Sequence, residues 1–175
     1  RSELGKIQLL IPPIEEQVLI ADALADTDEL IATLERLIAK KQAIKQGMMQ
    51  QLVTGRTRLP GFAGEWSELT LGDVAQFSKG MGLPKSAIVP GGHLPCVHYG
   101  ELFTHYGSEI GSVTSRTNDL SLRVRSVGND VLMPTSDVTP RGLAKASAIG
   151  LDGVVLGGDI LVIRPNRQQV FGPFL

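Results

Sequence analysis

The sequence is poor in cysteine and aromatic residues, and it carries no excess of one charge. The single cysteine, Cys96, excludes a disulfide within the chain and suits a reducing compartment, so we expect a cytoplasmic protein. The 17 Lys and Arg residues stand against 18 Asp and Glu, which gives a formal net charge of −1. A protein that binds nucleic acid through bulk positive charge is thereby excluded.

Long apolar runs and a signal sequence are also missing. No run approaches the ~20 apolar residues that a membrane-spanning helix needs, so we expect no membrane partner. The first residues, RSELGKIQLLIPP, have no long apolar core followed by a small-residue cleavage site. We therefore expect no secretory signal.

The sequence contains no recognisable catalytic or cofactor-binding motif. It has no GxGxxG fingerprint, no GxxxxGK[ST] phosphate loop, no amino-methyltransferase signature and no nuclease carboxylate cluster. His93, His98 and His105 are spaced by five and seven residues, which does not suit a zinc site. Ser136 and Asp137 form no recognisable triad with these distant histidines. We therefore expect a chain that is not an enzyme and that binds no cofactor or metal.

Residues 11–59 have the features of one long helix. Pro12 and Pro13 mark its start, because proline suits a first helical position and not an interior one. No proline interrupts residues 14–54, and Gly55 suits the left-handed conformation that ends many helices. Some 40 residues at ~1.5 Å each give a rod of roughly 60 Å. A helix of this length is expected to span or join separate parts.

The apolar residues of this helix recur every three or four positions and so share a face. A face of this width and regularity favours a partner helix, in a coiled coil or a bundle, over a lone solvated helix. The alternative is that the helix packs on its own domain. The residues that we expect to pair are Ile20, Leu24, Leu30, Ile31, Leu34, Leu37, Ile38, Ile44, Met48 and Leu52.

The charges of the helix are sorted along its length. Its acidic residues lie between Glu15 and Glu35, and its basic residues lie between Arg36 and Lys45. Complementation of the helix dipole acts only in the terminal turns, so it does not explain the change of sign in the middle. Antiparallel pairing would set the acidic half against the basic half, whereas parallel pairing would oppose like charges. We therefore predict an antiparallel partner helix, from a second copy of this chain or from a related segment.

A different kind of sequence follows the linker at residues 56–64, RTRLPGFAG. Helical periodicity gives way to short apolar runs separated by Gly, Pro, Ser and Asn, which is typical of a mostly β domain. Residues 68–77 are expected to open this domain as a strand or turn. Further strands are expected at residues 94–99, 110–114, 120–127, 130–133, 144–149, 154–156 and 159–164, and at residues 6–11 before the helix. The predicted fold class is α+β: one long coiled-coil-like helix followed by a mostly β domain with short helices.

Several of these segments resemble the specificity (S) subunit of type I restriction-modification enzymes. The central region of that family is similar to PPIEEQ at residues 12–17, DELI at 28–31 and IKQGMMQQLVTG at 44–55. The opening of its target recognition domain is similar to LGDVAQFSKG at residues 71–80, and its GD-L strand is similar to GNDVLMP at 128–134. The helix motif is specific through its combination and order.

The resemblance implies a layout in which recognition domains alternate with long antiparallel helices. On that layout, residues 1–11 are the terminal strand of a preceding recognition domain, and residues 12–55 form the spacer helix. Residues 56–64 are a linker, and residues 65–175 are a target recognition domain. We expect this domain to be incomplete, because a whole S subunit is much longer than this chain. One hypothesis is that residues 6–11 of one copy complete the sheet of another copy.

The resemblance also implies a function. In this family methylation and cleavage belong to separate subunits, and the S subunit reads DNA and holds the assembly together. The expected partners are double-stranded DNA, methyltransferase subunits, restriction subunits indirectly, and the antiparallel partner helix. We predict a DNA sequence-recognition and scaffolding subunit that reads one half-site and docks methyltransferase subunits. The alternative is a structural helical dimerisation protein whose truncated domain no longer binds DNA.

The candidate DNA-binding residues lie in three segments of the second region, at 78–87, 98–100 and 135–145. Basic and acidic residues balance over residues 66–175 at nine each, so this region alone should bind DNA weakly. Hydroxyl and lysine groups suit contacts to phosphates, and the arginine fork of Arg141 is the best candidate for a base contact. For each residue the alternative is an ordinary solvated loop. The candidates are Lys79, Lys85, Ser86, His98, Tyr99, Thr135, Ser136, Thr139, Arg141 and Lys145.

Other residues are expected to have structural roles. The arginines Arg116, Arg123 and Arg125 are expected at a strand edge. Trp66 and Phe77 are expected in the core. Cys96 is expected to be a small core residue, because no activating partner lies near it in the sequence.

Overall fold

The computed structural model describes residues 3–121, 124–136 and 139–175, and the chain divides into two compact units, Arg1–Ser67 and Glu68–Leu175. The first unit contains η1 (Glu3–Lys6), a short 3₁₀ helix, and α1 (Ile14–Val53). The short helices of the second unit are α2 (Leu71–Val74), η2 (Lys85–Ala87), α3 (Glu101–Thr104), α4 (Pro140–Leu143) and η3 (Gly172–Phe174). Its strands are β1 (Ala75–Lys79), β2 (Leu94–Val97), β3 (Glu109–Ile110), β4 (Arg116–Thr117), β5 (Asp130–Pro134), β6 (Ser147–Ile149), β7 (Val155–Leu156) and β8 (Ile160–Pro165).

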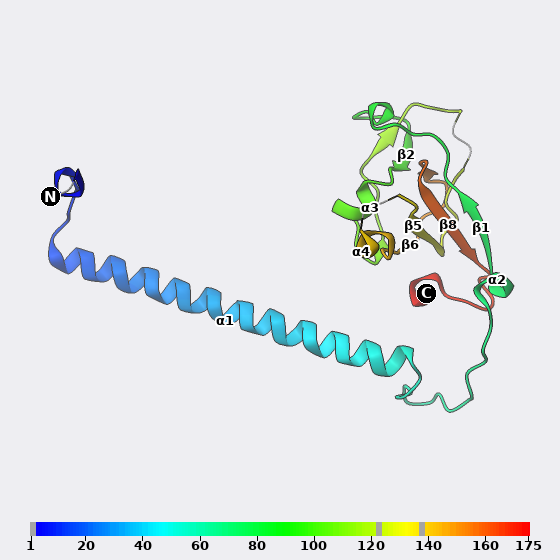
Figure 1. The fold of residues 1–175 in the computed structure, drawn as a ribbon, viewed down its shortest axis with the longest axis horizontal. Coiled ribbons are helices and arrows are strands. Elements are labelled where there is room, and N and C mark those ends of the chain that lie inside the picture. Colours follow the sequence, from blue (N-terminus) through cyan, green and yellow to red (C-terminus); the bar gives the residue numbers. More distant parts are fainter. Residues whose placement is uncertain (1–2, 122–123, 137–138) are drawn as a thin grey trace. The chain divides into compact units, whose positions relative to one another are not determined.

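The first unit is dominated by α1, a single helix of 40 residues (Figure 1, blue to cyan). It begins after Pro13, whose ψ of 149° lies outside the helical region, and Glu15 and Glu16 occupy its first turn. No residue of Ile14–Val53, all of which the structure describes, is buried. The predicted pairing face is therefore an exposed apolar surface of the helix. Nine of its ten residues are exposed and Leu52 is half-buried.

The end of α1 is set by Gly55, which has a φ of +69°. This left-handed conformation confirms the predicted C-terminal cap, because a residue with a Cβ adopts it only at a cost. The Gly55 N–H donates to the Leu52 carbonyl at 3.2 Å, and the Thr57 N–H donates to the Gln51 carbonyl at 3.1 Å. Two carbonyls of the last turn are thus satisfied.

The strand predicted at residues 6–11 is not present in this structure. Glu3–Lys6 form a 3₁₀ helix, and residues 7–11 have no regular secondary structure. A strand needs the backbone groups of a neighbouring strand, and in the described residues none pairs with this segment. Its apolar side chains Ile7, Leu9, Leu10 and Ile11 are exposed.

The second unit is built from two sheets. A five-stranded sheet has the order β1-β8-β5-β6-β3, and a three-stranded sheet has the order β4-β2-β7. The pairs β3–β6 and β2–β7 are parallel, whereas the other pairs are antiparallel. The main core joins residues of both sheets and of α3, among them Val97, Leu102, Leu132, Leu156 and Val162. Alternate residues of β5 and β8, such as Val131 and Ile163, form a smaller cluster on the other face of the five-stranded sheet.

This architecture confirms the predicted fold class, a long helix followed by a mostly β unit with short helices. The strands predicted at residues 94–99, 130–133, 154–156 and 159–164 correspond to β2, β5, β7 and β8. Those predicted at 110–114 and 144–149 are shorter, as β3 and β6. Within the segment 68–77, the short helix α2 precedes β1.

The strand predicted at residues 120–127 is wrong in its described part. Residues 122–123, and with them Arg123, lie outside the described residues, and Arg125 forms only an isolated bridge to Val155. Backbone hydrogen bonds hold this segment without a regular strand: the Ser126 N–H donates to the Val154 carbonyl and the Ser126 carbonyl accepts from the Gly153 N–H, both at 2.8 Å. The Ser126 side chain adds two more hydrogen bonds. Its hydroxyl donates to the Leu151 carbonyl at 2.6 Å and accepts from the Val154 N–H at 3.0 Å.

Among the helices in the described part of the chain, none combines the length and apolar character needed to cross a membrane.

Candidate nucleic-acid interface

The loops that carry the candidate residues meet at one end of the five-stranded sheet. Strand β1 ends at Lys79, which pairs with Leu161, and β5 ends at Pro134, which pairs with Ile160. Asp159, just before β8, joins the two: its carboxylate lies 3.1 Å from the Lys79 Nζ. Its carbonyl accepts from the Thr135 N–H at 2.9 Å. The first and third predicted segments therefore begin side by side.

The loop after β1 is held by close backbone contacts. The Gly80 N–H donates to the Ile160 carbonyl at 2.8 Å, and a Cβ at Gly80 would lie 1.9 Å from the Gly157 carbonyl oxygen. Only glycine fits this approach. The loop then passes through η2, where Lys85 and Ser86 are exposed. The loop thus exposes two candidate side chains, and its start at Gly80 is tightly packed against Gly157.

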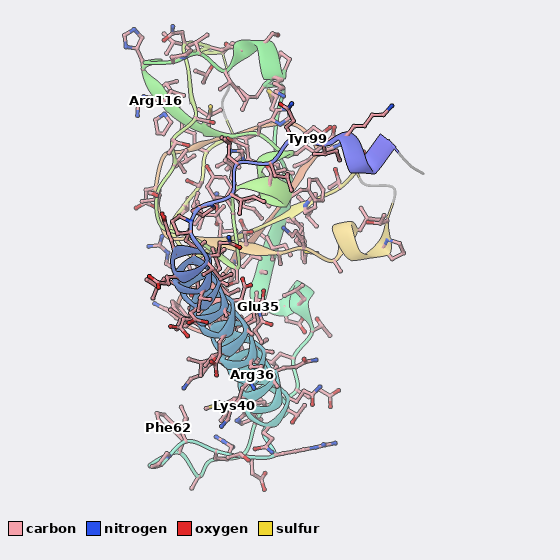
Figure 2. All side chains as sticks on the ribbon, turned by 90° about the vertical axis from the view of Figure 1, so that its left-hand side faces the viewer. Glu35, Arg36, Lys40, Phe62, Tyr99 and Arg116 are labelled. Atoms are coloured by element: carbon pink, nitrogen blue, oxygen red, sulfur yellow. The ribbon has the colours of Figure 1, made fainter. Side chains whose placement is uncertain are left out.

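The segment 98–100 follows β2. It lies near the start of the first loop, because Gly157, which packs against Gly80, also donates its N–H to the Val97 carbonyl at 3.0 Å. The His98 N–H donates to the Glu101 carboxylate at 2.7 Å, and the His98 Nδ1 accepts from the Gly100 N–H at 3.1 Å. Tyr99, labelled in Figure 2, is half-buried and packs against the main core. His98 and Tyr99 are therefore more fixed than residues of an open loop.

Lys145 ties the third segment to α3, the helix that directly follows the second segment. Its Nζ donates to the Leu102 carbonyl at 3.2 Å and to the Phe103 carbonyl at 3.0 Å, at the end of α3. Thr139 caps α4, since its hydroxyl accepts from the Gly142 N–H at 3.1 Å. Both residues hold the loop in shape.

Two other candidates in this segment, Thr135 and Ser136, are exposed after β5. Arg141 lies in α4, but its side chain is outside what the structure describes, as are residues 137–138 with Asp137. The structure thus brings all three predicted segments together, while the contacts of the Arg141 side chain stay a prediction.

Most of the described Lys and Arg side chains of the second unit donate hydrogen bonds to backbone carbonyls of that unit. Arg116, labelled in Figure 2, donates to the Gly92 and His93 carbonyls at 2.5 and 2.9 Å. Arg125 donates to the Gly153 carbonyl at 3.1 Å. Arg116 lies in β4, at the edge of the order β4-β2-β7, as predicted, whereas Arg125 forms only an isolated bridge to Val155.

Two further arginines pair with acids. Arg164 forms a two-point pair with Asp130, at 2.8 Å from Nε and 2.7 Å from Nη2. That hydrogen bond raises the pKa of Arg164. Arg167 pairs with Asp152 at 3.6 Å. Among the cations of Glu68–Leu175 whose side chains the structure describes, only Lys85 has a side chain that makes neither a hydrogen bond nor an ion pair. The sequence did not reveal these structural roles, because the acceptors are distant in the chain.

The two aromatic residues expected in the core are exposed. Trp66 is 48% exposed and lies on Gly55, with the Arg58 guanidinium 5.2 Å from its ring centre. Phe77 is 51% exposed, because β1 is an edge strand that pairs only with β8 in the described sheet. By contrast, Cys96 is fully buried, as predicted, and burial raises the pKa of its thiol to about 11.

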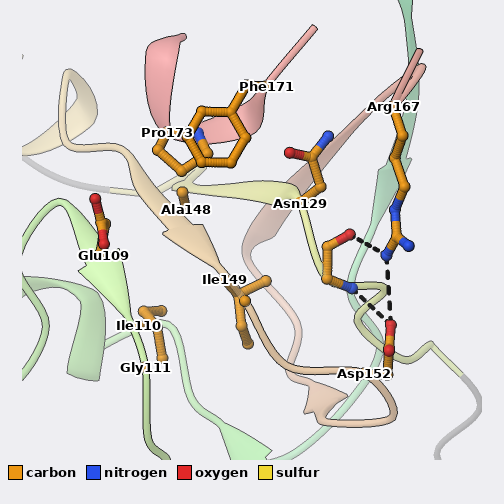
Figure 3. Close-up of a pocket in the computed structure, with 12 residues that line it drawn as sticks. Glu109, Ile110, Gly111, Asn129, Ala148, Ile149, Asp152, Arg167, Phe171 and Pro173 are labelled. Atoms are coloured by element: carbon orange, nitrogen blue, oxygen red, sulfur yellow. Dashed lines mark hydrogen bonds and ion pairs between the residues drawn. The ribbon is translucent and has the colours of Figure 1, made fainter.

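A cavity of about 590 Å³ lies at the other end of the five-stranded sheet (Figure 3). Ile110 and Ile149 line it on one side, and Phe171 reaches over it from the C-terminal segment. Asp152 accepts from the Gly128 N–H at 2.7 Å and pairs with Arg167 at its rim. None of the ten candidate residues lines this cavity. In the described residues, no group of three or more His, Cys, Asp or Glu side chains is placed to hold a metal ion.

No family model matches this sequence. Over 91 residues, the chain is 30% identical to a protein of Methanocaldococcus jannaschii that carries the provisional name MjaX type I restriction enzyme specificity subunit. The match covers 47% of this chain and 21% of that protein. The chain thus spans about a fifth of the length of this curated relative.

Solved structures with a similar fold cover most of this chain. One, from work on assembly and conformational transition of the type I restriction-modification system, covers 90% of this chain and 38% of its own (TM-score 0.53, 21% identity). The HsdS subunit from Thermoanaerobacter tengcongensis covers 91% and 39% (TM-score 0.51, 21% identity). The type I S subunit from M. genitalium covers 91% and 39% (TM-score 0.52, 17% identity). The chain is therefore similar to type I specificity subunits, as its motifs indicated, and shares their fold.

Proposed function

We propose that this chain is the DNA-recognition and scaffolding part of a type I restriction-modification complex. It reads one half-site of the target, docks methyltransferase subunits and reaches restriction subunits indirectly through them. The role is non-catalytic, requires no cofactor of its own and belongs in the cytoplasm.

One observation carries this proposal: three polar segments distant in sequence gather at one end of the five-stranded sheet, in a unit that follows a 40-residue helix. Base sequence is read by side chains held in register on a rigid scaffold, and phosphate contacts fix that register. The close backbone packing at Gly80 and the Lys145 contacts supply such a scaffold. The similarity to S subunits supports the same reading.

The candidate residues have different parts in this proposal. Lys145 and Thr139 position the third loop. His98 and Tyr99 lie in the second segment and are held in place by hydrogen bonds and core packing. The exposed side chains that contact DNA are Lys79, Lys85, Ser86, Thr135 and Ser136. Arg141 contacts a base edge, because an arginine fork matches the acceptors of guanine in the major groove.

The proposed domain organisation follows from the same role. Residues 12–55 are a spacer whose antiparallel partner helix sets the distance between DNA-reading modules, at roughly 60 Å for 40 residues. Residues 65–175 are the reading module, connected through a linker at residues 56–64. Residues 1–11 belong to a preceding module.

A mobility-shift assay with duplex DNA tests the proposal, run with and without the cognate methyltransferase subunit. We expect weak binding by the chain alone, since its charges balance, and sequence-selective binding in the complex. Competition with unrelated duplex separates selective from non-selective binding. Absence of selective binding in both conditions would overturn the recognition role.

A second candidate function is a structural dimerisation protein that does not bind DNA. The engagement of most cations of the second unit in internal contacts favours it. The same assay distinguishes the two candidates, because a dimer without DNA affinity supports only the second.

A further inference from the structure

The turn at residues 157–159, between β7 and β8, makes contact with all three candidate segments. Its first N–H donates to the Val97 carbonyl at 3.0 Å, directly before the second segment. Its second N–H donates to the Gly82 carbonyl at 2.6 Å, within the first segment. Its last carbonyl accepts from the Thr135 N–H at 2.9 Å, at the start of the third. This turn therefore lies where the three segments meet, although none of its residues was a candidate in the sequence.

The backbone of the turn fixes the position of its one charged residue, Asp159. A Cβ at Gly157 would lie 3.2 Å from the Leu83 Cβ, and a Cβ at Gly158 would lie 3.1 Å from the Gly82 carbonyl oxygen. Asp159 itself has a φ of +60°, a conformation that among residues with a Cβ is adopted mainly by Asn and Asp. The Asp159 carboxylate is thus attached to a tightly packed backbone, as precise base recognition requires.

The carboxylate pairs with Lys79 at the end of β1. The Lys79 Nζ lies 3.1 Å from Asp159 Oδ1, and the two side chains are 60% and 49% exposed. An ion pair this exposed contributes little to stability, and the positive φ of Asp159 is itself unfavourable. Phosphate binding does not explain the carboxylate either, because like charges repel. A role in recognising another chemical group does explain it.

The Lys79–Asp159 pair has the hydrogen-bonding pattern that complements a G·C base pair. In the major groove guanine offers the acceptors O6 and N7, and the N4 amino group of cytosine offers a donor. The O6 and N4 atoms are hydrogen-bonded to each other and so lie about 2.9 Å apart, close to the 3.1 Å between Nζ and Oδ1. A lysine suits the guanine acceptors, and an aspartate suits the cytosine amino group.

An A·T pair suits the two side chains less well. It also places a donor beside an acceptor, the adenine N6 and the thymine O4, but the thymine methyl group lies next to that acceptor. Guanine offers Lys79 two acceptors on one base edge, whereas adenine offers only N7. The pair therefore favours G·C.

We propose that Lys79 and Asp159 together read one G·C base pair of the half-site in the major groove. Lys79 donates to O6 and N7 of the guanine, and Asp159 accepts from the N4 amino group of the cytosine. The exposed Lys85, Ser86 and Thr135 lie on the segments that the turn contacts and supply the surrounding DNA contacts. This assignment rests on the proposed function and adds the base pair that is read and a further residue that reads it.

Selection from a random duplex library tests the assignment, with the chain in complex with its methyltransferase subunit. Sequencing of the bound duplexes gives the preferred base at every position of the site. We expect Asp159→Gly, which suits the positive φ and removes the carboxylate, to reduce the preference for G·C at one position by about ten-fold. Lys79→Met should reduce the preference at the same position. The other positions should keep their preferences.

Asp159→Asn gives a sharper outcome, because asparagine tolerates this φ and its amide matches the N6 and N7 atoms of adenine. We expect this variant to accept A·T at the position where the unaltered chain selects G·C. Asp152→Asn is the matched control, since it removes the same charge from an exposed aspartate that pairs with Arg167 at the opposite end of the sheet. It should leave every preference unchanged. Circular dichroism and thermal unfolding check that all variants are folded.

The possible failures are distinguishable. If the unaltered complex selects no sequence, the proposed function and this assignment both fail. If it selects a sequence whose preferences stay the same in the Asp159 variants, or weaken equally at all positions, the assignment alone fails. Loss of preference at different positions in the Lys79 and Asp159 variants would also overturn it.

Discussion

Arg164 and Asp130 form the most buried ion pair among the described residues of the second unit. The Asp130 side chain is 1% exposed and also accepts from the Val127 N–H at 2.8 Å. The hydrogen bond to Asp130 raises the pKa of Arg164, so the guanidinium keeps its charge at every pH below its ordinary pKa. At the residue scale, this pair fixes the start of β5 to β8.

We expect Arg164→Gln to lower the free energy of unfolding by about 3 kcal/mol, because it leaves a buried carboxylate without its cation. Arg167→Gln is the matched control. Its pair with Asp152 is solvent-exposed on both sides, at 56% and 78%, and should contribute less than about 1 kcal/mol. Urea denaturation of both variants measures the difference. Similar losses in the two proteins would mean that burial does not distinguish the pairs.

Cys96 provides a second test at this scale. Burial raises the pKa of its thiol from 9.0 to about 11, with a further contribution from Glu101. A raised pKa means that folding favours the neutral thiol. The resulting stability is present below pH 9 and is lost as the pH rises toward 11.

In the native protein at pH 8 we therefore expect a thiolate fraction near 10⁻³ and almost no labelling by a thiol reagent. Denatured protein should label at once and serves as the reference. Fast labelling of the native chain at pH 8 would contradict the buried position of Cys96.

At the scale of elements, the stability of α1 depends on local helix propensity. Gly47 lies inside the helix, and a Cβ there would meet nothing within 4 Å. Gly47→Ala should therefore stabilise the helix by about 0.5–1 kcal/mol, since glycine loses more backbone entropy on folding than alanine does. Ala43→Gly, one turn earlier, is the reverse control. Thermal unfolding followed by circular dichroism at 222 nm should shift upward for the first variant and downward for the second.

The same elements show which features a sequence can predict. Pro13 and Gly55 bound the helix through local chemistry, so both ends could be predicted from the sequence. The apolar runs that form β5 and β8 predict buried strands. Their place in the order β1-β8-β5-β6-β3 could not be predicted, because it depends on contacts between residues far apart in the chain.

The candidate site shows the same division. The composition of the three loops suggested their chemistry, yet the sequence did not reveal that Lys145 would donate to carbonyls of α3. Segment 6–11 has the apolar pattern of a strand, but no strand in the described part of the chain pairs with it. Trp66 looked like a core residue because its neighbours in the folded loop, Gly55 and Arg58, are not visible as neighbours in the sequence.

At the scale of the whole molecule, balanced charge means that the proposed DNA binding depends on a few contacts. Most cations of the second unit already donate to carbonyls or carboxylates, and Lys85 is the exception among its described side chains. Each phosphate contact contributes about −0.9 to the slope of log K against log salt concentration. The phosphate contacts made by this chain should therefore contribute only a small part of the salt dependence of log K for the complex.

Lys85→Gln should reduce the magnitude of that slope by about 1 in the complex with the methyltransferase subunit, because one phosphate contact is lost. Arg167→Gln removes the same charge at the opposite end of the five-stranded sheet and should leave the slope unchanged. Titrations by fluorescence anisotropy at several salt concentrations, with cognate and unrelated duplexes, measure both variants. If Arg167→Gln changed the slope as much as Lys85→Gln did, the DNA would contact the end of the sheet that carries the cavity, and the three loops would not be the reading surface.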